Sequence, residues 1–398
     1  MSRAFLDIPD AVAPDYQGGS LLNLSVSFAT GIGRAPGRRF AAAPCTCLPD
    51  LSGSRIVVFL LIDGLGANDV KRRGPGAFMD DHAQGQLTSV FPPTTASAVT
   101  ASMSALAPAA HGLTGWYIRD PRFGGVLAPL PMVRRDRQPL TGWWPVPRLF
   151  PYACLFQHLR CRSAVVSPEH ILGSPFNMRH TRGAAARYPY RTLDEMVAAI
   201  GEAARNLGRR GGFVYAYHPD YDALAHAHGI GSDECTQHYG LLDDALQAVR
   251  RALAGLEATL VVSADHGFID SPPEQQVCLE DHPALAACLD GPLWGEWRSA
   301  YCRVRPQRKD DFENVFQAEL GERFALVGAR RLIDSGAFGP AAKVHPRLAE
   351  RVGDYAIIGR GHWTLHDRLP AERAHTMVGV HAGVSADEMF IPLVVAHC

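Results

Sequence analysis

The chain has 398 residues, more than the ~250–300 at which a single hydrophobic core usually stops growing, so one large domain with insertions or two domains are expected. Apolar residues make up 47% and charged residues 20%, and 39 Lys and Arg against 40 Asp and Glu leave a net charge of −1. This balance excludes a general electrostatic attraction to nucleic acid or to a membrane surface, and the longest apolar run, residues 56–62, is far shorter than the ~20 residues that span a bilayer.

The nine cysteines are odd in number and scattered, without a CxxC pair. Three aspartates, Asp7, Asp10 and Asp15, fall within the first fifteen residues, where a signal peptide would need an apolar stretch. Together these features predict reduced cysteines and a cytoplasmic protein.

Short runs rich in β-branched and aromatic residues predict buried strands of a parallel sheet. The clearest are Arg55–Ile62, Ser163–Ser167, Phe213–Tyr217 and Thr259–Ser263. Helical patterns alternate with them, for example over about 192–207 and 232–255. Alternating strands and helices predict an α/β fold.

Two regions break this alternation. Residues from about 115 to 187 are rich in Pro, Gly, Trp and Arg and lack periodicity, so we expect an irregular insertion that shapes the substrate pocket. Residues 281–359 carry their own strand signal at Ala300–Val304 and helix signal at Asp310–Leu320, which predicts an inserted cap domain. The catalytic core would then comprise residues 1–280 and 360–398.

Carboxylates follow three of the predicted strands. Asp63 follows the first, Asp222 and His226 lie just past the third, and Asp265 with His266 follows the fourth. The carboxyl ends of parallel strands meet at one edge of a sheet, where such folds bind ligands. Acids gathered there repel one another unless a cation neutralises them. The sequence therefore predicts a metal site.

The ligand types narrow the choice of metal. Mixed carboxylate and imidazole ligands suit Zn²⁺ best and Mn²⁺ or iron less well, whereas Ca²⁺ and Mg²⁺ prefer oxygen alone. Asp222 and His226 are four residues apart and would share one face of a helix. The number of ligands is sufficient for two ions, as in binuclear sites of phosphoryl transfer.

The segment after Pro92-Pro93 supplies a hydroxyl nucleophile. The small residues from Thr95 to Ala107 are compatible with a helix, which places Thr94 or Thr95 at its N-terminus. Free backbone N–H groups there favour a phosphate oxygen or a developing alkoxide. A threonine at this position can also simply cap the helix.

Five segments, in this order along most of the chain, resemble motifs of the alkaline phosphatase superfamily, most closely its nucleotide pyrophosphatase/phosphodiesterase (type I phosphodiesterase) branch. They are LLIDGLG, FPPTTASAVTASMSALAPAAHG, YHPDYDALAHAHG, VVSADHGFID and VGVHAGVSADEMFIPLVV. The last matches a terminal His-Gly-Gly pattern, with Ala382 in place of the first glycine. The resemblance implies a three-layer α/β/α sandwich around a mostly parallel sheet.

The resemblance also implies the ligands of two ions. One ion would be held by Asp63, Thr95, Asp265 and His266, and the other by Asp222, His226 and His381. His381 is preferred to His362, His366 and His375 because it alone lies in the terminal motif, and His218, Asp220 and His228 are expected around the site or at the surface.

The family's nucleophile stands thirteen residues before a proline that precedes His-Gly by three. Here that proline is Pro108, before His111-Gly112, so the count selects Thr95. The implied mechanism is a double displacement, in which a phosphothreonine forms and water then hydrolyses it.

The favoured activity is hydrolysis of phosphodiester or nucleotide pyrophosphate bonds of a small-molecule substrate. Trp116 stands where the family's phosphodiesterases carry a phosphate-binding Asn, and Trp116 or Tyr117 is expected either to stack on an aromatic group of the substrate or to pack in the core. A phosphomonoesterase or phosphonate hydrolase is the alternative, with Arg119, Arg134 and Arg135 to meet the extra charge. A phosphoryl transferase or mutase and a non-catalytic metal-binding module are the remaining alternatives.

Overall fold

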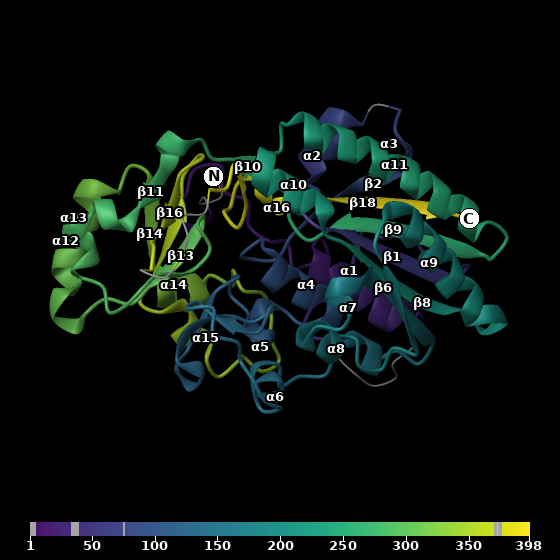
Figure 1. Ribbon diagram of the computed structural model, residues 1–398, viewed down its shortest axis with the longest axis horizontal. Helices are drawn as coiled ribbons and strands as arrows, with labels where there is room; N and C mark the ends of the chain where they lie inside the picture. Colours follow the sequence, from purple (N-terminus) through teal and green to yellow (C-terminus); the bar gives the residue numbers. More distant parts are fainter. Residues whose placement is uncertain (1–4, 33–39, 75, 370–371, 373–375) are drawn as a thin grey trace.

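The larger part of the molecule, on the right in Figure 1, is built on a seven-stranded sheet in the order β2-β18-β9-β1-β8-β6-β7. The structure is a computed structural model and describes residues 5–32, 40–74, 76–369, 372 and 376–398. The strands are β1 Ile56–Ile62, β2 Ala83–Thr88, β6 Arg162–Pro168, β7 Ala186–Tyr190, β8 Gly212–His218, β9 Ala258–Ala264 and β18 Phe390–His397. All neighbours from β9 to β7 pair in parallel, and only β18 runs antiparallel to both of its neighbours. The predicted mostly parallel sheet is confirmed.

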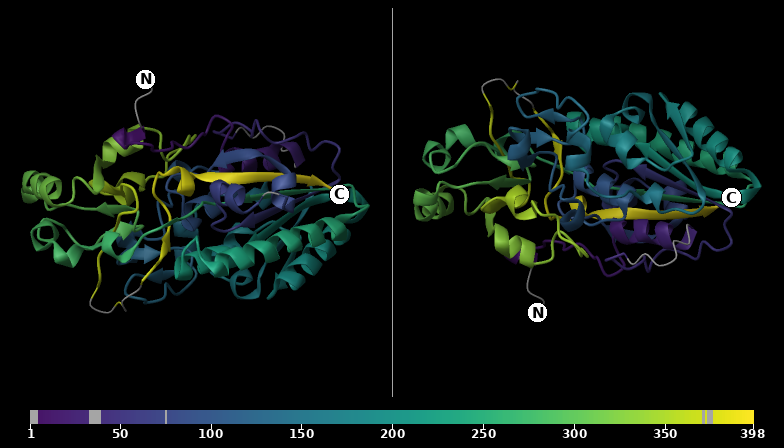
Figure 2. Two further views of the ribbon diagram at one scale, coloured as in Figure 1. Left: turned by 90° about the horizontal axis from the view of Figure 1, so that it is seen from above. Right: turned by 90° about the horizontal axis from the view of Figure 1, so that it is seen from below.

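Helices cover both faces of this sheet, as its strands require. Every residue of β1 and β9 is buried, so neither face can be left to solvent. Helices α1 (Leu21–Ser27) and α4 (Thr95–Ser104) pack together on one face. Helices α9 (Leu193–Leu207) and α11 (Asp233–Leu253), which were predicted over about 192–207 and 232–255, pack together on the other (Figure 2). The result is the three-layer arrangement.

The register of the central strands aligns their carboxyl ends. Ile62, the last residue of β1, pairs with His218 at the end of β8 and with Ala264 at the end of β9. The segments that leave these three adjacent strands therefore start side by side. This alignment brings the acids predicted at the strand ends to one edge of the sheet.

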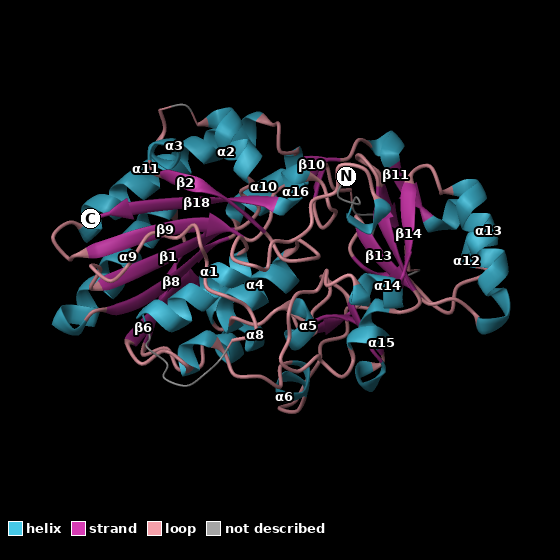
Figure 3. Cartoon of the chain, turned by 180° about the vertical axis from the view of Figure 1, so that it is seen from behind, coloured by secondary structure: helices cyan, strands magenta, loops and turns pink. Residues whose placement is uncertain are grey.

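A second, four-stranded antiparallel sheet lies beyond that edge (Figure 3). Its order is β12 (Trp294–Gly295), β13 (Ser299–Cys302), β15 (Tyr355–Gly359) and β14 (Phe324–Gly328). Helix α13 (Lys309–Glu319) buries two phenylalanines against one face, and α14 (Ala329–Asp334) and α15 (Leu348–Val352) bury leucines against the other.

Whether the predicted cap and insertion form separate domains stays a prediction. The structure shows which strands and helices each of them contains. The second sheet falls within residues 281–359, while β11 (Gln276–Cys278) and β16 (Thr364–His366) pair with each other just outside these bounds. The region 115–187 contains a small sheet of β3 (Ile118–Asp120), β4 (Gly125–Ala128) and β5 (Val133–Arg134). It also contains β6, a strand of the central sheet, so it is not one uninterrupted excursion.

Among the described residues, no helix combines the length and the apolar character that crossing a bilayer requires. All nine cysteines are described, and each is a free thiol. The cytoplasmic location stays a prediction.

Candidate active site

Asp63, Asp265 and His266 form a first cluster of buried metal-ligating side chains at the ends of β1 and β9. The Nε2 atom of His266 lies 3.3 Å from Oδ1 of Asp63 and 3.5 Å from Oδ2 of Asp265. Two ligands of one tetrahedral ion with bonds of ~2.1 Å are separated by about 3.4 Å. The next residue along the chain must be a glycine, Gly267, because an added Cβ would stand only 2.0 Å from the carbonyl oxygen of Asp387.

Asp222, His226 and His381 form the second cluster. Asp222 and His226 share one face of α10 (Asp220–His228), as their spacing predicted. The Nε2 atoms of His226 and His381 lie 3.6 and 3.8 Å from Oδ1 of Asp222. His381 directly follows β17 (Gly379–Val380). Ala382, which replaces the family's glycine, has φ +84°, the left-handed region that glycine adopts without strain.

The two clusters adjoin each other. Nε2 of His266 lies 3.8 Å from Oδ1 of Asp222, and the rings of His266 and His381 stack with centroids 3.8 Å apart. Six of the seven side chains that the resemblance assigned to two ions thus fall into the two expected groups. The seventh, Thr95, lies beside the first group. Their roles as ligands stay a prediction.

Backbone carbonyls orient all three imidazoles. The Nδ1 atoms of His226, His266 and His381 contact the carbonyl oxygens of Gly379 at 2.9 Å, Gly267 at 3.2 Å and Pro93 at 3.1 Å. A proton on Nδ1 satisfies each contact and leaves the lone pair of each Nε2 directed at the carboxylates. This arrangement is typical of metal-binding histidines.

The buried carboxylates of the site favour a bound cation. Oδ1 of Asp222 and Oδ2 of Asp265 are buried and have no hydrogen-bond partner. Burial, together with the charge of Asp63, raises the pKa of Asp222 to about 8, and burial raises the pKa of Asp265 to about 7. Burial also lowers the pKa of His266 to about 3 and holds the pKa of His381 well below its usual range, so these two imidazoles supply no positive charge. Two neutral imidazoles beside carboxylate oxygens that lack a hydrogen-bond partner fit one or two divalent ions of the zinc type.

The structure separates the two candidate threonines. Thr94 precedes α4 and its hydroxyl donates to Glu296, whereas Thr95 is the first helical residue. Oγ1 of Thr95 lies 3.4 Å from Nε2 of His266 and 3.5 Å from Oδ1 of Asp63. The Thr95 hydroxyl therefore belongs to the first cluster and stands at the N-terminal end of a ten-residue helix.

A cavity of about 380 Å³ opens on Thr95, Asp63 and Asp222. Its deeper wall is apolar and is formed mainly by Val99, Met103, Leu130, Val165, Ile171 and Phe176. None of the described residues that line it is a lysine or an arginine, and Trp116 is among them. Tyr117 is not, and its ring instead faces the Arg135 guanidinium, 5.5 Å from the ring centroid.

Two residues of the site were missed by the sequence analysis. The Tyr217 hydroxyl donates to Oδ2 of Asp63, and its position near the end of β8, three residues before the start of α10, was the available signal. Glu296, from the connection between β12 and β13, accepts hydrogen bonds from the Thr94 hydroxyl and from the backbone N–H of Trp116 at 2.6 Å. Burial raises the pKa of Glu296 to about 7. Nothing in the sequence pointed to Glu296.

The rival histidines of the C-terminal region lie elsewhere. Nδ1 of His362 contacts the carbonyl oxygen of Asp270 at 2.6 Å, and His366 stacks on Trp297. His375 lies outside the described residues.

The sequence as a whole matches a known family. The model of the type I phosphodiesterase/nucleotide pyrophosphatase family matches residues 57–383, most of the chain. The chain belongs to this family. It is therefore a phosphoric ester hydrolase of the alkaline phosphatase superfamily, and the family is metal-dependent. No curated protein sequence matches the chain.

Solved structures share the fold at low sequence identity. Murine ectonucleotide pyrophosphatase/phosphodiesterase 5 is 16% identical, with a TM-score of 0.64 over 85% of this chain and 87% of its own. The human protein of the same name is 15% identical, with a TM-score of 0.65 over the same shares. Phosphonoacetate hydrolase from Sinorhizobium meliloti, solved with phosphonoacetate, is 16% identical, with a TM-score of 0.59 over 86% of this chain and 90% of its own.

Proposed function

We propose that this hydrolase cleaves phosphodiester bonds, nucleotide pyrophosphate bonds included, through a phosphothreonine on Thr95. One observation carries the proposal: the Thr95 hydroxyl, which contacts Asp63 and His266, lines a largely apolar cavity together with Asp63 and Asp222. A murine relative solved with AMP is described as an inactive variant in which a threonine is replaced by alanine, which supports the threonine as nucleophile.

The residues have distinct tasks in this reaction. Oγ1 of Thr95 loses its proton and attacks phosphorus, the P–O bond to one ester group breaks, and that group leaves as an alcohol after taking up a proton. Water later attacks the phosphothreonine, the bond between Oγ1 and phosphorus breaks, and the Thr95 hydroxyl is regenerated. The free N–H groups at the start of α4 would hold a non-bridging oxygen. Asp63, Thr95, Asp265 and His266 would hold one ion, and Asp222, His226 and His381 the other. Two divalent ions in this place would favour the Thr95 alkoxide and offset charge on the phosphoryl oxygens.

We propose Zn²⁺ for these ions, ahead of Mn²⁺ and iron. Each cluster combines carboxylate oxygens with imidazole nitrogens, which suits Zn²⁺ better than the ions that prefer oxygen alone.

The choice of a diester over a monoester rests on charge. A monoester carries a second negative charge, and the described lining of the cavity offers no lysine or arginine to meet it. The three arginines considered for this task are engaged elsewhere: Arg119 with Glu350 at 3.5 Å, Arg134 with Asp136 at 2.7 Å and Arg135 with Asp367 at 2.8 Å. A diester with an apolar or aromatic ester group, packed near Trp116, fits this cavity better. The phosphomonoesterase or phosphonate hydrolase is the second candidate.

Two aryl phosphates test the proposal. Protein loaded with zinc should cleave a bis-aryl phosphate faster than the matching mono-aryl phosphate, and Thr95→Ala should lower kcat for both by at least ~10³-fold, the loss expected for a covalent nucleophile. A mono-aryl rate far above the bis-aryl rate would overturn the diester preference. Unchanged turnover in Thr95→Ala would overturn the mechanism.

A further inference from the structure

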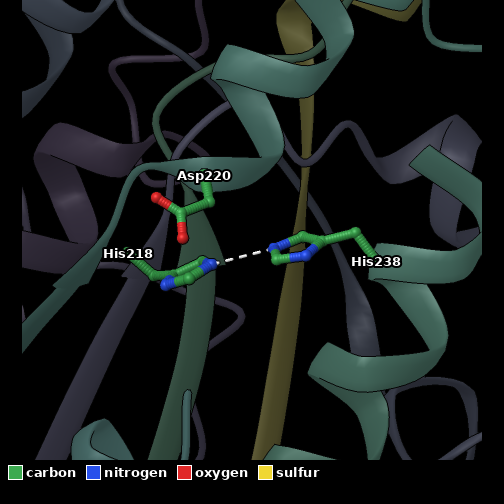
Figure 4. Close-up of side chains that lie close together, drawn as sticks. All are labelled: His218, Asp220 and His238. Carbon is green, nitrogen blue, oxygen red and sulfur yellow. Dashed lines mark hydrogen bonds between the residues drawn. The ribbon is translucent and has the colours of Figure 1, made fainter. Parts of the chain in front are cut away.

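A third group of metal-ligating side chains lies outside the candidate active site (Figure 4). It consists of His218 at the end of β8, Asp220 at the start of α10 and His238 on α11. Nε2 of His218 lies 3.0 Å from Nε2 of His238, and the two rings are nearly parallel. A carboxylate oxygen of Asp220 lies within 4.8 Å of one ring nitrogen of each histidine. Three elements thus bring two nitrogens and one oxygen close to one another.

Tyr190 fixes the orientation of His218, the buried residue of this group. His218 is only 1% exposed, and its Nδ1 lies 3.2 Å from the Tyr190 hydroxyl, which itself donates to the carbonyl oxygen of Tyr217. The Tyr190 oxygen can therefore only accept from His218, so the proton sits on Nδ1 and the lone pair of Nε2 faces His238. A second-shell acceptor that sets the tautomer in this way is usual for histidines that bind metals.

This group is separate from the two clusters at Thr95. Asp220 and Asp222 are two residues apart on α10, so their side chains leave the helix about 200° apart. Asp222 faces His226 and His381, whereas Asp220 is exposed and faces His218 and His238. An ion at one group would lie on the other side of α10 from an ion at the other.

We propose that His218, Asp220 and His238 bind a third divalent transition-metal ion such as Zn²⁺, which stabilises the start of α10. Two imidazoles and one carboxylate are ligands that Zn²⁺ accepts, with water completing a tetrahedral shell. The two nitrogens would separate by a few tenths of an ångström to reach about 3.4 Å, a shift that the half-buried His238 can make. The proton on Nε2 of His238 passes through solvent to its own Nδ1, so both imidazoles stay neutral.

The ion would join three elements, two of which, β8 and α10, also carry residues of the candidate active site. It would bridge the end of β8 and the first residue of α10 to α11, and α10 carries Asp222 and His226. Its role would be structural, holding in place the helix that carries these two side chains.

Counting bound zinc tests the proposal directly. After equilibrium dialysis against zinc, wild-type protein should hold one more ion per chain, by elemental analysis, than His238→Gln. His228→Gln is the matched control, because it removes a histidine of α10 that belongs to none of the three groups, and it should bind as much as wild type. Equal zinc in wild type and His238→Gln overturns the proposal and leaves a histidine pair joined by a hydrogen bond.

Two further variants keep the test decisive. Asp220→Ala, at an exposed position, should lose the same ion if His238→Gln does not fold. Tyr190→Phe should keep the ion but weaken its affinity at least ~10-fold in a chelator competition, because the tautomer of His218 is no longer set.

The difference of one ion between wild type and His238→Gln should persist when both also carry Asp265→Ala, which separates this result from the outcome for the candidate active site.

Discussion

Among single residues, Tyr217 contacts one of the proposed metal ligands directly. The Tyr217 hydroxyl donates a hydrogen bond to Oδ2 of Asp63, which fixes the orientation of this carboxylate within the first cluster. Tyr217→Phe should weaken zinc binding at that cluster by ~10- to 100-fold in a titration against a chelating competitor.

Tyr215→Phe is the control for this substitution. Tyr215 also lines the cavity, but its hydroxyl lies 2.8 Å from the Ser102 hydroxyl and contacts no ligand. It should leave zinc affinity unchanged. Equal losses in the two variants would contradict the role given to Tyr217.

The Asp222 carboxyl makes the stability of the metal-free protein depend on pH. Its pKa is raised to about 8 by burial and by the charge of Asp63, so the folded state binds a proton that the unfolded state gives up near its ordinary pKa of ~3.9. The stabilising effect of that proton is complete at low pH and is lost as pH rises toward 8, at about 1.4 kcal/mol per pH unit.

Urea unfolding of chelator-treated protein between pH 6.5 and 8 measures this slope. Histidines of the unfolded state, with an ordinary pKa of ~6.5, also titrate in that window, so the comparison with a variant that lacks the carboxyl isolates the contribution of Asp222. The free energy of unfolding should fall with pH more steeply in wild type than in Asp222→Asn. Parallel slopes would show that Asp222 is ionised in the folded metal-free protein.

At the scale of elements, a buried ion pair connects the second sheet to the loop that carries His381. Nε and Nη2 of Arg298, just before β13, each lie 3.0 Å from a carboxylate oxygen of Glu388 in α16 (Ala386–Met389), and both side chains are at most 1% exposed. Oε1 of Glu388 also accepts from the backbone N–H of Gly383 at 2.7 Å. The pair therefore shapes the turn next to His381.

Removing one partner of this pair should be costly, since it leaves a buried charge unpaired. Arg298→Ala should lower the free energy of unfolding by about 3–5 kcal/mol. It should also weaken zinc binding at the second cluster. Arg191→Ala breaks an exposed pair with Glu169 and should cost far less, because solvent screens this pair. Similar costs for the two variants in urea denaturation would contradict this account.

At the scale of the whole molecule, the proposed ions would join segments that are far apart in the chain. The ligands leave β1, α10, β9 and β17, so an ion can bind all of them only in the folded state. Zinc at 1,000 times its dissociation constant should add about 4 kcal/mol per site to the free energy of unfolding.

Urea midpoints with zinc and with a chelator check this expectation. Magnesium is the control, because it prefers oxygen ligands and should give little shift. Identical midpoints with zinc and with chelator would show that the clusters do not bind zinc in the folded protein.

The sequence by itself determined the sheet and most of the ligands. Buried apolar runs can only be strands or helices, and a carboxylate directly after such a strand has its place set by the strand end, so Asp63 and Asp265 could be located by counting. Asp222 and His226 followed in the same way from helical spacing. His381 and the preference for Thr95 over Thr94 came from the family resemblance, because no local pattern distinguishes these residues from their neighbours.

The tertiary structure alone decided what surrounds these residues. Glu296, Arg298 and His238 act on side chains that are distant in sequence, and such contacts depend on how sheets and helices pack, which leaves no periodic trace. The same reason applies to the cavity: its apolar wall and the lack of lysine and arginine among the described lining arise from separate segments that meet only in the folded chain. The proposed preference for diesters rests on that lining, and sequence patterns reached only the residues around Thr95.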